Sequence, residues 1–69
     1  MTIGTVKFFD EGKGYGFIQP DNGGKDSFVH ISAVQAAGLG TLSKDQRVSY
    51  DVEADRNGKE SAINLSNAD

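Results

Sequence analysis

The residues of this chain that are equipped for chemistry are its aromatic rings, and they are concentrated in one short segment. Five of the six aromatic residues lie between positions 8 and 28: Phe8, Phe9, Tyr15, Phe17 and Phe28. Alternate side chains of a β-strand point to the same side of a sheet, so Tyr15 and Phe17 share a face, and Phe28 shares one with His30. If exposed, such a face offers π-surfaces on which unpaired bases can stack.

Two further patterns indicate which way these rings point. Ile18 and Val29 alternate with the rings and can supply the core from the opposite face. Lys13 and His30 stand in register with the rings, and burying them without partners would cost several kcal/mol. We therefore expect the rings to face outward, with lysines meeting the phosphates of a bound strand. The alternative is that the rings form the core and that Gly16 is an outward gap.

The sequence offers few side chains that could carry out catalysis. His30 is its one histidine, there is no cysteine, and Ser27 alternates away from His30 on the same segment. These facts argue against a local nucleophile and base pair and exclude a zinc site built from cysteines or from two histidines. The glycines around Tyr15 do not form a phosphate-binding loop, because Phe17 stands at the third glycine position. We expect no enzymatic activity, no metal and no cofactor.

The length and charge of the chain limit the number of domains it can form and the partners it can bind. The 69 residues include seven basic and ten acidic side chains, for a net charge of -3. A chain this short holds one small core, so residues 1–69 are expected to form a single domain. The net charge disfavours nucleic acid as a partner, but screening makes the local placement of lysines matter more than their total. Without an apolar span or a signal-peptide pattern, we expect a cytoplasmic monomer that does not bind membranes.

Hydrophobic residues recur with a period of two along most of the chain, which is typical of β-strands. Residues 46–54 show the pattern most clearly, with these side chains on one face: Val48, Tyr50, Val52 and Ala54. Asn57-Gly58 then predicts a tight hairpin turn. After the turn, Ser61, Ile63 and Leu65 alternate in a further predicted strand.

Three more strands are predicted upstream, over residues 4–10, 14–19 and 27–31. Ser32 is a plausible N-cap for one short helical turn over residues 33–35. Five strands without a long helix must hide the edges of their sheet, and closing the sheet on itself does so. The pattern therefore predicts an all-β protein, a small five-stranded barrel.

Two stretches carry a family resemblance. Lys13-Gly14-Tyr15-Gly16-Phe17-Ile18 and Phe28-Val29-His30-Ile31 resemble the two ribonucleoprotein motifs of the bacterial cold-shock domain family, and the likeness extends over nearly the whole chain. The resemblance implies an antiparallel Greek-key barrel of the oligonucleotide/oligosaccharide-binding (OB) fold. It also implies a protein that binds single-stranded RNA and DNA. Such a protein often acts as an RNA chaperone that keeps transcripts unstructured and affects transcription antitermination or translation.

The resemblance also implies roles for individual residues. The family's stacking positions match Phe8, Tyr15, Phe17, Phe28 and His30. Lys7 and Lys13 match cationic contacts, and Asp26 matches an acidic residue that accepts hydrogen bonds from bases. Positions where the family commonly has rings are occupied by Ile31 and Leu39. The final hairpin lacks the family's frequent Gly-Pro, and either Arg56 or Lys59 replaces the cation near that loop.

The rival to nucleic-acid binding is a protein-interaction module, because an exposed aromatic patch also marks protein interfaces.

Ser27 is expected to point inward beside Val29, where the family usually has an apolar residue. A hydroxyl adds no apolar burial there, so Ser27→Val is expected to stabilise the fold.

Overall fold

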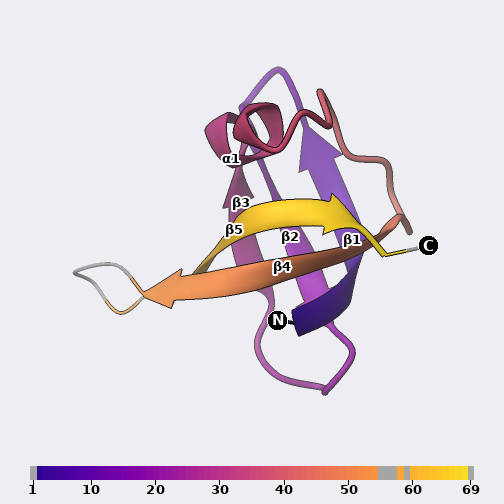
Figure 1. Ribbon diagram of the computed structural model, residues 1–69, viewed down its shortest axis with the longest axis vertical. Coiled ribbons are helices and arrows are strands. Elements are labelled where there is room, and N and C mark those ends of the chain that lie inside the picture. The colour runs from indigo at the N-terminus through magenta and orange to yellow at the C-terminus, as the bar shows by residue number, and fades with distance from the viewer. Residues whose placement is uncertain (1, 55–57, 59, 69) are drawn as a thin grey trace.

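Five β-strands close into a barrel in the computed structural model, which describes residues 2–54, 58 and 60–68 (Figure 1). In chain order the elements are β1 (Thr2–Asp10), β2 (Tyr15–Pro20), β3 (Ser27–His30), α1 (Ile31–Ala36), β4 (Arg47–Ala54) and β5 (Glu60–Asn67). Around the barrel the strands follow the order β1-β2-β3-β5-β4. The predicted all-β, five-stranded barrel is confirmed.

The closure of the barrel requires one parallel pairing. Four pairings are antiparallel: β1 with β2, β1 with β4, β2 with β3, and β4 with β5. β3 and β5 then run in the same direction and meet at Phe28 and Ser61. A closed ring with an odd number of strands cannot alternate in direction all the way round. The antiparallel arrangement implied by the resemblance therefore holds at every described pairing except this one.

The core fills the inside of the barrel and is built from alternate strand residues. Ile18 and Val29 have no exposed surface, as the alternation predicts, and Tyr50 is the largest fully buried side chain. The complete set of buried apolar residues is Val6, Ile18, Val29, Val34, Leu42, Val48, Tyr50, Ala62 and Leu65. The core thus takes the face of β2 and β3 that lies opposite the rings.

A bulge in β1 turns Phe8 outward. Strict alternation from Val6, which is fully buried, would place Phe8 inside the barrel. The register of β1 against β2 shifts between Val6 and Phe8. Because a bulge inserts one extra residue, it exchanges the two faces of the strand beyond it. Lys7 and Phe8 are consequently both exposed, and Phe9 packs against the core.

Gly16 lets β1 approach β2 closely at this bulge. A Cβ atom on Gly16 would lie 2.8 Å from the Cα atom of Phe9, and closer still to the carbonyl oxygen of Phe8. Contacts that short are sterically forbidden, so a larger residue would push the two strands apart. Gly16 is buried, so it occupies the inner face between two outward rings rather than an outward gap.

β4 and β5 continue past the barrel as a hairpin that projects to one side (Figure 1). Val48 and Tyr50 are fully buried, as predicted. Val52 is 39% exposed and Ala54 is also exposed, so their predicted place on the buried face is wrong. The reason is that the pairing of β1 with β4 ends at Tyr50, so Val52 and Ala54 lie beyond the part of β4 that the described residues of β1 cover.

The alternation of β5 is interrupted at Asn64, whose φ is 53°. Asparagine tolerates this left-handed region better than most residues. The interruption places Ala62 and Leu65, three residues apart, in the core and leaves Ile63 half-buried. The predicted shared face of Ser61, Ile63 and Leu65 is therefore wrong.

α1 begins at Ile31 and uses a different cap from the one predicted. His30 is the N-cap, and its Nδ1 accepts a hydrogen bond from the backbone N–H of Ser32 at 3.1 Å. Ser32 lies inside the helix instead, with its Oγ 2.8 Å from the same nitrogen. Val34 anchors α1 to the core. In the part of the chain that the structure describes, no helix is long and apolar enough to cross a membrane.

Candidate nucleic-acid interface

A cluster of five rings from three strands lies on the outer face of the barrel. Its members, which we call the aromatic platform, are Phe8, Tyr15, Phe17, Phe28 and His30. Strand register assembles it, because Phe17 of β2 is paired with Phe8 of β1 and with Phe28 of β3. Tyr15 is paired with His30 in the same way. Strand alternation predicted a shared face for Tyr15 and Phe17 and another for Phe28 and His30, and the family resemblance added Phe8. The structure brings all five rings together on one face.

Phe17 is the centre of the platform. Its ring centroid lies 5.6 Å from that of Phe8, 5.8 Å from that of Phe28 and 6.2 Å from that of Tyr15. Its contacts with Phe28 and Tyr15 are edge-to-face, whereas Tyr15 and Phe28 stack at 5.7 Å with an interplanar angle of 21°. Aromatic pairs of this geometry each contribute about 0.5–1.5 kcal/mol beyond area burial. The rings therefore hold one another in place without a ligand.

The platform rings face outward. Phe8 is 43% exposed, His30 is exposed, and Tyr15, Phe17 and Phe28 are half-buried against one another. None of them belongs to the core. The alternative in which the rings form the core is therefore wrong, and a flat ligand has access to their faces.

Lys7 and Asp26, both predicted site residues, form an ion pair beside the platform. The Nζ of Lys7 lies 3.0 Å from Oδ2 of Asp26, and the two side chains are 51% and 34% exposed. Lys7 adjoins Phe8 in the bulge of β1, and Asp26 immediately precedes β3. The pair thus links the two outer strands of the platform and sets a cation and a carboxylate at its edge.

Lys13 lies in the turn between β1 and β2, where the sequence also placed it, between two predicted strands. The turn requires Gly14 at a φ of 81°, a conformation that glycine adopts without a steric penalty. The backbone N–H of Lys13 donates to Oδ1 of Asp10 at 3.2 Å, and its side chain is exposed. Lys13 therefore sits two residues before Tyr15, at the end of the platform opposite Asp26.

A hollow of about 350 Å³ adjoins the platform and was not predicted. Its lining consists of Phe17, Lys25, Asp26, Phe28, Gly58 and Glu60. Two of these residues are platform rings, and three are charged. Lys25 and Glu60 were not among the predicted site residues. Lys25 directly precedes Asp26, whereas Glu60 comes from a separate segment that the closure of the barrel brings beside β3.

The remaining predicted site residues are placed differently from one another. Ile31 is half-buried at the start of α1, and its backbone N–H donates to the carbonyl oxygen of Gly14 at 2.9 Å. It thus lies at the Tyr15 end of the platform. Leu39 packs against the core instead. Arg56 and Lys59 lie outside the described residues.

A larger hollow, of about 570 Å³, lies between α1 and β5. Its lining is uncharged and without rings: Ser32, Ala33, Ala36, Ala37, Ile63, Asn64 and Leu65. Since neither a stacking surface nor a charge faces this hollow, it lacks the chemistry that the platform offers to a nucleic acid.

The family assignment follows from comparison with known proteins. The model of the 'Cold-shock' DNA-binding domain matches residues 2–68. The chain belongs to the cold-shock domain family. The match includes all five platform rings, and nucleic-acid binding follows from membership of this family of binding domains.

Several curated proteins are similar to the chain over nearly its full length. "Probable cold shock protein y4cH" of Sinorhizobium fredii is 58% identical over 66 residues, which cover 94% of this chain and 96% of that protein. Cold shock protein CspA of Rhizobium meliloti is 54% identical with the same coverage. In Arabidopsis thaliana, cold shock domain-containing protein 4 is 47% identical over 96% of this chain but only 33% of its own length. The fold therefore also occurs as part of larger proteins.

Proposed function

We propose that this cold-shock domain binds single-stranded RNA and DNA through the aromatic platform. The observation that supports this proposal is the contact of five rings on one outward face, with Phe17 at their centre. Each base stacked on an aromatic side chain contributes about 1–3 kcal/mol, with little dependence on its identity. Several such rings can bind a short strand even after the entropy cost of ordering it.

Cations at the platform edge favour a nucleic-acid strand over other flat ligands. Lys7 and Lys13 lie near Phe8 and Tyr15, at two different margins of the platform. In our proposal their ammonium groups meet phosphates while the rings take the bases. A duplex keeps its bases stacked internally, so only an open strand can use the rings.

We further propose that the protein acts as an RNA chaperone. A ligand that binds only the open strand shifts a hairpin toward opening by RT ln(1 + [L]/Kd) for each site. An abundant protein of moderate affinity would thereby keep transcripts unstructured, which affects transcription antitermination or translation. In this proposal residues 1–69 work as one domain and as a monomer in the cytoplasm.

The experiment that tests the proposal compares two fluorescein-labelled oligonucleotides of equal length by anisotropy. One is oligothymidine, and the other is a fully paired hairpin. We expect oligothymidine to bind at least about tenfold more tightly, because only its bases are free to stack. Equal affinity for the two would contradict the proposal.

A protein-interaction module is the alternative, and the 43% exposure of Phe8 is the observation that favours it. Salt separates the two functions. Binding to a single strand weakens with a log-log slope of about -0.7 for each phosphate neutralised, whereas an apolar protein contact responds little. A flat salt dependence of oligothymidine binding would favour the alternative.

A further inference from the structure

The hollow beside the platform continues the stacking surface into a cavity that has charged side chains in its lining. Phe17 and Phe28 belong to both, so a base stacked on these rings turns one of its edges toward the hollow. The other described side chains that line it are those of Lys25, Asp26 and Glu60. Its volume of about 350 Å³ falls within the usual range of small-ligand sites, about 300–1,000 Å³.

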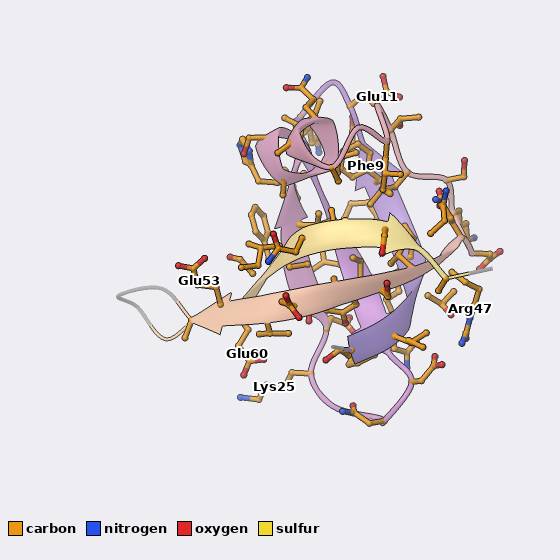
Figure 2. All side chains as sticks on the ribbon, viewed as in Figure 1. Phe9, Glu11, Lys25, Arg47, Glu53 and Glu60 are labelled. Carbon is orange, nitrogen blue, oxygen red and sulfur yellow. The ribbon has the colours of Figure 1, made fainter. Side chains whose placement is uncertain are left out.

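Glu60 supplies a carboxylate that the described residues do not neutralise. Oδ2 of Asp26 lies 3.0 Å from Nζ of Lys7, whereas the carboxylate of Glu60 has no hydrogen bond or ion pair with the side chain of any other described residue. Glu60 and Lys25 also line a second hollow, of about 220 Å³. In Figure 2 the two side chains lie close together at the same corner of the molecule, below the projecting hairpin. They therefore form the outer wall of the hollow beside the platform.

The charges of the lining favour a base edge over a phosphate. Among the described residues, two carboxylates and one ammonium line the hollow, and Lys7 pairs with one of these carboxylates. These charges cancel, so the described lining offers no surplus of positive charge to hold a phosphate. An ionised carboxylate only accepts hydrogen bonds, so it pairs with a base edge that carries N–H donors. Lys25 remains available to a phosphate that flanks such a base.

We propose that this hollow selects guanine and that Glu60 is the residue that determines the selection. Guanine has two adjacent donors on its Watson–Crick edge, N1–H and the N2 amino group, which match the two oxygens of one carboxylate. Thymine and uracil have a single N–H between two carbonyl oxygens, and a carboxylate repels both oxygens. The inference rests on the proposed function, because it requires a strand whose bases stack on Phe17 and Phe28.

The test measures the affinity of labelled thymidine hexamers in which one guanine replaces thymine at each position in turn. One well-placed bidentate contact discriminates between bases by about tenfold. We therefore expect at least one position at which guanine tightens binding by about that factor. Hypoxanthine at the same position lacks the 2-amino group. It should give less than half of the increase in the logarithm of the affinity that guanine gives over thymine.

Glu60→Gln identifies the residue responsible. We expect this variant to reduce the ratio of guanine to thymine affinity to within about twofold, because an amide matches the guanine edge with only one acceptor. Glu11→Gln is the matched control, since it removes the same charge at an exposed site at the opposite end of the molecule (Figure 2). The control should keep the full ratio.

The outcomes separate this inference from the proposed function. If no position favours guanine, or if Glu60→Gln keeps the preference, the inference that Glu60 selects guanine is wrong. The proposed binding of single strands to the platform is not affected by that result. If the thymidine hexamer does not bind at all, the proposed function fails. A loss of preference in Glu11→Gln as well would attribute the effect to net charge and would overturn the role of the hollow.

Discussion

The hydroxyl oxygen of Ser27 lies 3.3 Å from the phenol oxygen of Tyr50, and both side chains are buried inside the barrel. Ser27 is on β3 and Tyr50 on β4, two strands that are not neighbours in the barrel. The hydrogen bond, although long, therefore crosses the core. Ser27 points inward as the sequence predicts, but its hydroxyl serves as the partner of a buried phenol.

This contact reverses the expected effect of Ser27→Val. The substitution adds apolar burial but leaves the phenol of Tyr50 without its partner, and a buried unpaired polar group costs about 1–3 kcal/mol. We expect Ser27→Val to lower the free energy of unfolding by about 1 kcal/mol in urea titrations. In a Tyr50→Phe background the same substitution should be neutral or stabilising. A higher stability of Ser27→Val with Tyr50 intact would show that the contact contributes nothing.

The ion pair between Lys7 and Asp26 should restrain the binding of phosphates. Asp26→Asn keeps one carbonyl acceptor but releases Lys7, which can then meet a phosphate. We expect tighter binding to oligothymidine at low salt and a log-log salt slope steeper by about 0.7. Stability should change by less than about 1 kcal/mol, as is usual for exposed pairs.

Asp21→Asn is the control for that experiment. It removes the same charge and breaks the other exposed ion pair that the described residues form, between Asp21 and Arg47. Arg47 lies on the side of the molecule away from Lys25 and Glu60 (Figure 2). We expect an unchanged salt slope. An equal steepening in both variants would mean that net charge, rather than the release of Lys7, governs the effect.

Ile31 and Leu39 should respond differently to the introduction of a ring, although the resemblance implies the same role for both. Ile31→Phe adds a π-face at the Tyr15 end of the platform and should tighten oligothymidine binding by about fivefold. Leu39→Phe overfills a position that packs on the core and should cost about 1–3 kcal/mol of stability without tightening binding. Anisotropy titrations and urea unfolding of both variants decide this. Tighter binding by Leu39→Phe would place that residue in the interface.

Much of the platform could be predicted because it depends on local alternation. Tyr15, Phe17, Phe28 and His30 lie on regular strands, where a period of two assigns each face from the sequence alone. Phe8 was assigned to the platform by family resemblance, since simple alternation from Val6 would bury it. Only the paired structure shows the bulge that turns it outward.

Features that depend on closure of the barrel could not be predicted. The exposure of Val52 follows from where β1 stops covering β4, and the hollow at Glu60 follows from the approach of three separate segments. Alternation shows which face a side chain occupies but not which side chain it contacts. The hydrogen bond of Ser27 with Tyr50 and the ion pair of Lys7 with Asp26 could therefore not be predicted. The fold could therefore be predicted without these long-range contacts, but the details of the site could not.

The most direct test of stacking on the platform compares oligothymidine affinity in Phe17→Leu and Phe9→Leu. Both residues are half-buried phenylalanines, but Phe17 is the centre of the platform and Phe9 packs against the core. Leucine keeps much of the apolar volume and removes the π-face. We expect Phe17→Leu to weaken binding by at least about fivefold, the lower end of the effect of one stacked base. Phe9→Leu should change affinity by less than about twofold, whatever it costs in stability. Equal affinities in the two variants would contradict binding through the aromatic platform.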